Sequence, residues 1–155
     1  MSADLRERAL WEARSWIGTP YRAQSSCKGA GADCLGLVRG VWRAVCGGEP
    51  EPPPPYSPDW AERARAGFED ADPLLDAARR HLQPLPRSVG EAGDVVLFRY
   101  APDRPAKHCG ILCASLAGPQ PRMIHALQDR CVCQSALTPW WRRRIAGVFR
   151  FTPSS

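Results

Sequence analysis

The chain has 155 residues, of which 44% are hydrophobic and 24% are charged, and its formal net charge is +5 at pH 7. This length and composition predict one domain with a hydrophobic core. No apolar run approaches the roughly 18 residues of a membrane span, so membrane insertion is not expected. The positive charge is dispersed except at Arg142, Arg143 and Arg144, which we interpret as an exposed basic turn and not as a nucleic-acid site.

The first predicted element is an amphipathic helix over residues 4–17, ended by the Gly18, Thr19, Pro20 sequence. Tyr21 follows in a loop that leads to a glycine-rich segment. The N-terminus is charged and lacks the apolar region of a signal peptide. We therefore expect no export signal in this chain, so that any action outside the cell needs another carrier.

A cysteine stands at the predicted start of the next helix, residues 34–46. Apolar residues recur there with helical spacing at Leu37, Val38, Val41, Trp42 and Val45. Asp33 is a typical N-cap residue, so Cys34 falls in the first turn, where backbone N–H groups and the helix dipole favour an anion. A thiol in this position has a lowered pKa, which favours a nucleophile. The alternative is that Cys34 is a small buried hydrophobic residue.

Residues 49–90 form an insert within a single domain that spans residues 1–155. The insert opens with a proline-rich connector at 49–55, and residues 58–82 have the composition of one or two short helices. We interpret the insert as a lid or a docking element, with a covering helical hairpin as the alternative.

Five strands are predicted after the insert, over residues 95–98, 108–114, 122–126, 130–134 and 146–151. Helices followed by a run of antiparallel strands predict an α+β fold. His108 and His125 lie on two neighbouring predicted strands that are joined by a turn, so we expect them to be cross-strand neighbours at a partly open cleft. A nucleophilic cysteine needs a base, and the base needs an orienting partner, which this pair supplies.

On a strand, Cys109 and Cys113 share one face, as do Cys131 and Cys133, and we interpret them as ordinary small core residues. Metal binding is the alternative for these cysteines. The chain has seven cysteines and no regular spacing, which argues against a disulfide framework and favours a reducing origin. Possible zinc ligands are Cys131, Cys133, His108, Cys109 and Cys113. The Cys-x2-Cys and His-x3-His spacings of zinc sites are absent, so we expect no metal and no cofactor.

Five short motifs occur in the order and rough spacing of the NlpC-type family of papain-like cell-wall peptidases, which the chain resembles. They are GTPY at 18–21, GADCLGLV at 31–38, GDVVLF at 93–98, HCGI at 108–111 and MIHA at 123–126. The resemblance covers residues 5–151 apart from the insert. It implies a papain-like fold, in which N-terminal helices, including the nucleophile helix, pack on a five- to six-stranded antiparallel sheet.

The resemblance also implies roles for individual residues. Cys34 is the nucleophile, His108 the general base and His125 the group that orients His108. Tyr21 directs its hydroxyl towards the developing oxyanion.

Two further residues are implied to bind substrate. Asp33 pairs with a substrate amino group, and Leu35 helps to hold the substrate in a position where most of the family has serine. The family's Trp-Gly-Gly after the tyrosine is replaced here by Arg22, Ala23 and Gln24, which is expected to reshape the pocket wall.

The function implied by the resemblance is that of a cysteine endopeptidase that cuts the γ-D-glutamyl–meso-diaminopimelate bond of peptidoglycan stem peptides. The proline-rich insert and the Trp140-Trp141-Arg142-Arg143 segment resemble peptidases of phage tails and gene transfer agents. Such an enzyme is made in the bacterial cytoplasm and carried by a phage-like particle, beside tail or baseplate proteins, to the wall in the periplasm. The alternatives are a catalytically inactive papain-like component of a tail or baseplate, and an amidase or acyl transferase that acts on another amide.

Overall fold

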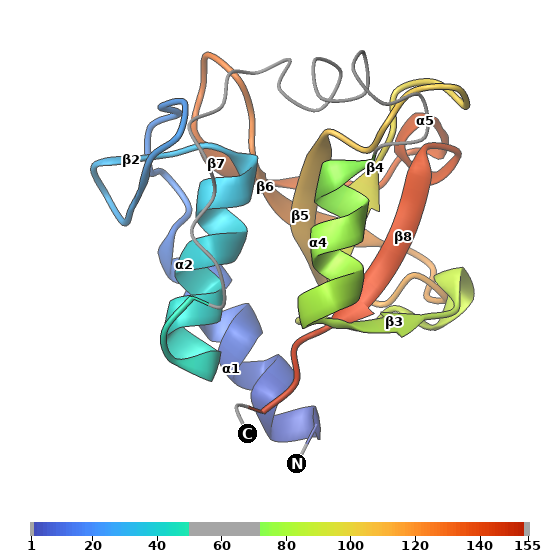
Figure 1. Ribbon diagram of the computed structural model, residues 1–155, viewed down its shortest axis with the longest axis horizontal. Coiled ribbons are helices and arrows are strands. Elements are labelled where there is room, and N and C mark those ends of the chain that lie inside the picture. Colours follow the sequence, from blue (N-terminus) through green and yellow to red (C-terminus); the bar gives the residue numbers. More distant parts are fainter. Residues whose placement is uncertain (1, 50–71, 154–155) are drawn as a thin grey trace.

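The computed structural model describes residues 2–49 and 72–153 (Figure 1). Its centre is a six-stranded antiparallel sheet with strand order β3-β8-β4-β5-β6-β7. The strands are β3 (Gln83–Leu85), β4 (Val95–Phe98), β5 (His108–Ala114), β6 (Arg122–Ala126), β7 (Val132–Ala136) and β8 (Ile145–Arg150). The helices are α1 (Ser2–Ser15), α2 (Cys34–Cys46), α4 (Pro73–His81) and the short α5 (Pro139–Arg142), with a 3-10 turn at Arg87–Val89. A small hairpin, β1 (Ser26–Cys27) and β2 (Gly31–Ala32), precedes α2.

The predicted α+β class is confirmed, as are both N-terminal helices and the order of the five predicted strands. The strand predicted at 130–134 is displaced to Val132–Ala136. The sixth strand, β3, was missed because it has only three residues and contains Pro84. It lies at the edge of the sheet, where a residue without a backbone N–H is tolerated.

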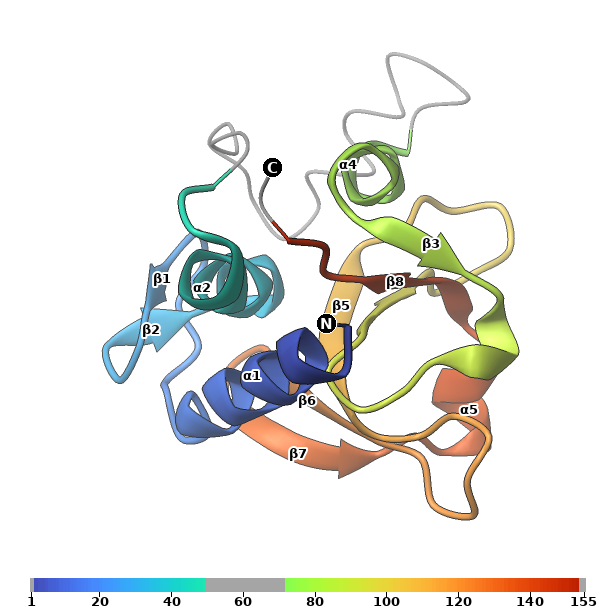
Figure 2. The ribbon, with the colours of Figure 1, turned by 90° about the horizontal axis from the view of Figure 1, so that it is seen from below.

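Both faces of the sheet are buried, and alternate residues of β4 show how. Val95 and Leu97 belong to the cluster that contains the apolar residues of α1, α2 and α4. Val96 and Phe98 point to the opposite face, into a second cluster with Leu112 and Met123. Figure 2 shows α1 and α2 beside each other on one side of the sheet, with α5 on the other side, where its Trp141 packs against the second cluster. The sheet therefore carries a core on each face, which fixes the register of the strands that hold the histidines.

The two N-terminal helices approach each other closely at a glycine. A Cβ atom at Gly40 of α2 would lie 2.1 Å from a ring carbon of Trp16. Only glycine permits this approach, which packs α2 firmly against the N-terminal segment. The start of α2 is thereby held in place relative to the sheet.

The described part of the insert is tied to the loop that follows β4. The carboxylate of Asp72, immediately before α4, accepts hydrogen bonds from the Ala106 backbone N–H at 3.0 Å and from the Arg99 guanidinium at 3.2 Å. Residues 50–55 of the predicted proline-rich connector and residues 58–71 of the predicted helices lie outside the described residues. Among residues 2–49 and 72–153, no helix is long and apolar enough to cross a membrane.

Candidate active site

Cys34 is the first residue of α2, as predicted. The preceding residue, Asp33, has extended backbone geometry and caps the helix, because its Oδ1 accepts the Gly36 N–H at 2.7 Å. Its Oδ2 accepts the Gln24 N–H at 2.8 Å, which ties the glycine-rich loop to the helix start. Asp33 is only 3% exposed, so its carboxylate is first of all a structural anchor for Cys34. Its binding of a substrate amine stays a prediction.

The two histidines and a serine form a chain of hydrogen bonds. Strands β5 and β6 pair directly, and His108 Nε2 lies 2.9 Å from His125 Nδ1. His125 Nε2 lies 2.9 Å from the hydroxyl oxygen of Ser135 on β7. Cross-strand proximity of the histidines was predicted, whereas Ser135 was missed. The expectation that both rings lie at a partly open cleft is wrong for His125, which is 1% exposed because β7 and Trp141 cover it.

Burial determines the protonation state of His125. Removal from water, followed by the positive charge of His108, lowers the pKa of His125 from 6.5 to about 3. When His108 is protonated, both of its ring nitrogens are donors, so a neutral His125 accepts at Nδ1 and carries its own proton on Nε2, which donates to Ser135. His108 then donates from Nε2 to His125, and its Nδ1 is the ring nitrogen left for Cys34. His125 can therefore orient His108 without acting as an acid itself.

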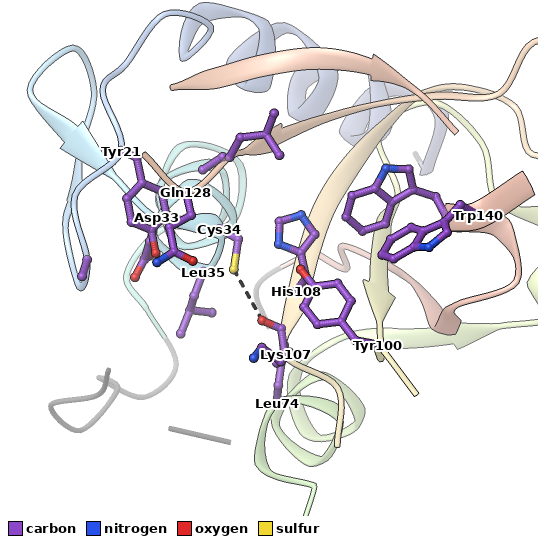
Figure 3. A pocket seen from close by; sticks show the side chains of 14 residues that line it. Tyr21, Asp33, Cys34, Leu35, Leu74, Tyr100, Lys107, His108, Gln128 and Trp140 are labelled. Carbon is purple, nitrogen blue, oxygen red and sulfur yellow. Dashed lines mark hydrogen bonds between the residues drawn. The ribbon is translucent and has the colours of Figure 1, made fainter. Parts of the chain in front are cut away.

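The thiol of Cys34 lies between this ring chain and a second cysteine. A hydrogen bond from the Cys109 thiol, together with the hydrogen bond and charge of His108, holds the pKa of Cys34 well below its usual range despite burial. The same contact and burial raise the pKa of Cys109, which therefore remains a donor. Figure 3 shows the Cys34 sulfur facing the His108 ring, with the Lys107 carbonyl oxygen 3.9 Å away. Cys34 is thus favoured as a thiolate.

Cys109 was interpreted from the sequence as an ordinary core thiol or a zinc ligand. Its position directly after His108 gives no sequence signal for the contact with Cys34, because consecutive residues of a strand point to opposite faces. Among the described residues, no group of three His, Cys, Asp or Glu side chains is placed to hold a metal ion. The expected absence of a cofactor remains a prediction.

A cleft of about 390 Å³ opens in front of Cys34 and His108. Tyr21, Asp33 and Leu35 also line it, so five of the six predicted site residues meet there, while His125 lies behind His108. Burial and the negative charges of Asp33, Cys34 and Asp129 raise the pKa of Tyr21 to about 12. Its hydroxyl therefore keeps its proton and can donate a hydrogen bond into the cleft, as an oxyanion stabiliser must. Leu74 of α4 completes one side, so the described part of the insert does contribute to the cleft.

An aromatic wall on the His108 side was not predicted as part of the site. The Trp141 ring stacks on His108 at 5.2 Å between centroids and meets His125 edge-on at 5.5 Å. Trp140 and Tyr100 also line the cleft. The sequence could signal this only through the adjacent tryptophans near the last strand. Trp141 restricts both imidazoles to the orientations that their hydrogen bond requires.

The lowered pKa of His125 predicts an acid-dependent loss of stability. The folded pKa of about 3 lies below the ordinary 6.5, so the stabilisation is complete above pH 6.5 and is lost as the pH falls towards 3. The slope from this group is at most about 1.4 kcal/mol per pH unit. Urea unfolding at pH 7, 5 and 4 should show a steeper loss for the wild type than for His125→Asn. Parallel losses in the two proteins would contradict a neutral, buried His125.

The contact between the two thiols predicts a change in alkylation. Cys109→Ala removes the donor to the Cys34 thiolate, so the apparent pKa of Cys34 in iodoacetamide labelling should rise by about one unit. Peptide mass spectrometry across pH 5–9 measures the labelling of each cysteine. Cys109→Ser retains a donor and should restore much of the wild-type profile, while Cys113→Ala, on the same strand, should leave it unchanged. Faster labelling of Cys46 than of Cys34 at pH 7 would contradict the assignment of the reactive thiol.

A family model for the NlpC/P60 family matches residues 18–150. The chain belongs to the NlpC/P60 family. This confirms the family resemblance seen in the five sequence motifs. No curated protein matches the sequence.

Solved structures share the NlpC/P60 fold. The NlpC/P60 domain of the peptidoglycan hydrolase SagA aligns with a TM-score of 0.58 and 22% identity over 94% of this chain and 98% of that domain. An N-acetylmuramoyl-L-alanine amidase from Bacteroides uniformis aligns with a TM-score of 0.60 and 14% identity, over 96% of this chain and 99% of that one. A lipoprotein-like NLP/P60 protein from Staphylococcus aureus aligns with a TM-score of 0.59 and 19% identity over 97% of this chain. The alignment covers 42% of that longer protein. At these identities the likeness establishes the fold.

Proposed function

We propose that this NlpC/P60 chain is a cysteine peptidase that hydrolyses peptidoglycan stem peptides at the γ-D-glutamyl–meso-diaminopimelate bond. The observation that carries the proposal is the reactive group itself. Cys34 lies at a helix N-terminus with a lowered pKa and faces His108, which a neutral His125 holds in position. The peptidoglycan hydrolase named among the structures of the same fold supports the substrate class.

The proposed reaction begins with attack of the Cys34 thiolate on the scissile carbonyl carbon. The carbonyl oxygen becomes an oxyanion, which the Tyr21 hydroxyl and the Cys34 backbone N–H stabilise. Protonated His108 gives its proton to the leaving amine, the C–N bond breaks and a thioester remains on Cys34. Water then attacks the thioester while His108 takes its proton, and the thiolate and the free carboxylate are released. His125 remains neutral and keeps His108 in one orientation throughout.

The free-energy cost of burying the polar groups of the site favours catalysis over a purely structural role. Burying two imidazoles and a thiolate stabilises the fold less than apolar side chains of the same volume would. The reacting atoms also border an open cleft instead of lying sealed in the core. An inactive tail component would need neither feature.

Delivery by a phage-like particle is part of the proposal and rests on the resemblance of the insert and the tryptophan–arginine segment to tail-associated peptidases. In this setting the chain is made in the bacterial cytoplasm and binds tail or baseplate proteins. Proteomics of purified particles from the producing cells tests it, since the chain must remain with the particles through a density gradient.

The decisive experiment is digestion of purified sacculi, followed by mass spectrometry of the released fragments. Cleavage at the proposed bond releases fragments that end in D-glutamate and others that begin with diaminopimelate. Release of intact stem peptides that begin with L-alanine would instead identify an amidase, the activity named for the Bacteroides uniformis neighbour. Absence of any fragment, with the Cys34→Ala protein as the blank, would favour the inactive structural role.

A further inference from the structure

The cleft has two chemically different ends, one on each side of the Cys34–His108 pair. Figure 3 shows Tyr21, Asp33 and Gln128 at one end, and Tyr100 and Trp140 at the other. The first end carries the negative charge of Asp33. The second lies beside Lys107, whose ammonium nitrogen is 5.4 Å from the centre of the Tyr100 ring. Charge therefore changes sign along the cleft.

The proposed reaction indicates which end of the cleft binds the fragment on the amine side of the scissile bond. His108 must protonate the leaving amine, so the amine fragment departs at the end of the cleft that contains His108 and the aromatic residues. In a peptide, the amine fragment is the one on the C-terminal side of the scissile bond. The end with Tyr100, Lys107 and Trp140 therefore faces the residue that follows the bond.

This end is an aromatic surface held in a fixed geometry. Tyr100 is 38% and Trp140 43% exposed, although each is a large ring, and their centroids are 6.0 Å apart. The Arg144 guanidinium carbon lies 3.8 Å from the centre of the Trp140 ring, and Arg144 Nη1 donates to the Trp140 carbonyl oxygen at 2.9 Å. These contacts hold Trp140 in place before any ligand binds, which lowers the entropy that binding costs.

We propose that Tyr100, Trp140 and Lys107 form a leaving-group subsite that binds a residue with an aliphatic side chain ending in a carboxylate. The inference rests on the proposed function and specifies which group of the leaving amine fragment the protein recognises. The two rings pack against the methylene groups, and the Lys107 ammonium pairs with the carboxylate. The distal end of meso-diaminopimelate carries such a carboxylate, on a carbon that also bears an ammonium group. Lys107 is partly buried, so the pair is screened less than one on the open surface.

The test uses two peptides that differ only in charge: L-Ala-γ-D-Glu-meso-diaminopimelate and the same peptide with the distal carboxylate converted to its amide. The wild type should show a kcat/KM about three- to tenfold higher for the acid. In Lys107→Gln the ratio should fall close to one. In Lys28→Gln it should stay at the wild-type value, because Lys28 pairs with Glu12 and does not line the cleft. A wild-type ratio retained in Lys107→Gln would overturn the proposal.

The aromatic surface is tested separately. Trp140→Ala should raise KM for both peptides severalfold and leave their ratio unchanged. Trp11→Ala is the matched control, since Trp11 is 73% exposed and lies outside the cleft. Equal KM values for Trp140→Ala and the wild type would show that the rings do not bind the substrate.

A binding measurement keeps the inference independent of the bond that is cut. Calorimetric titration of Cys34→Ala with each peptide gives two dissociation constants without turnover. Tighter binding of the acid, lost when Lys107→Gln is added, supports the subsite even if sacculi are not digested. Equal affinities, or no binding of either peptide, would overturn it, whereas failure of sacculus digestion alone would count only against the proposed reaction.

Discussion

Replacement of Cys34 by alanine is expected to abolish stem-peptide hydrolysis, with a loss of at least about 10⁴-fold in kcat. The thiolate forms the covalent bond in the proposed reaction, and no other cysteine takes its place, because Cys109 is buried and the raised pKa keeps it a thiol. Release of soluble peptides from sacculi, followed by chromatography, measures the loss. The fold should persist, since Cys34 lies at the first turn of α2, which is capped by Asp33.

Two controls make this result specific. Cys113→Ala removes another half-buried thiol from the sheet and should retain wild-type activity. Circular dichroism and the unfolding midpoint of Cys34→Ala should match those of the wild type within a few degrees. Hydrolysis at a substantial rate by a folded Cys34→Ala protein would exclude covalent catalysis by this residue.

His108→Ala should lower kcat by about 10²–10⁴-fold or more, because it removes both the proton acceptor and the donor to the leaving amine. Substitution of His125 should have a smaller effect that depends on geometry. Asparagine places its amide oxygen near the position of Nδ1 and can still accept from His108 Nε2, 2.9 Å away in the native protein. Glutamine reaches instead towards Ser135. We therefore expect the order of activity to be wild type, His125→Asn, His125→Gln and His108→Ala.

Steady-state kinetics on a soluble stem peptide gives this order, and pH–rate profiles show whether the base is still present. Ser135→Ala should reduce activity less than His125→Gln, since it removes only the last hydrogen bond of the chain. Full activity in a folded His108→Ala protein would exclude the papain-like mechanism. An equal and complete loss in both histidine variants would show that His108 cannot function without its orienting partner, or that the two roles are reversed.

The parts of the site that the sequence predicted depend on local patterns. The cap at Asp33 and the helical spacing after it place Cys34 at a helix start, and a turn between two apolar strands brings His108 near His125. These signals involve residues close together in the chain, so periodicity and turn chemistry are sufficient to detect them.

The parts that were missed depend on distant segments. Ser135 reaches His125 only through the β6–β7 register, and Trp141 reaches the histidines through the short helix before β8. Cys109 contacts Cys34 because α2 packs on β5, a tertiary contact between residues far apart in the chain. His125 was expected nearer to solvent because a sequence pattern does not show which side chains will cover a strand end.

Cys34 and the start of the connection from α2 to α4 lie at opposite ends of α2. The chain leaves α2 after Cys46, at the opposite end of this 13-residue helix and about 18 Å from Cys34. Extra residues that enter directly after Cys46 do so at this end of α2, whereas the other end of the connection leads to Leu74, which borders the cleft. Loop-closure entropy rises only by about 0.6 kcal/mol for each doubling of length. Relatives of this protein can therefore exchange the segment between α2 and α4 for longer or shorter ones, and acquire new binding surfaces there, while the distance between sulfur and imidazole stays constant.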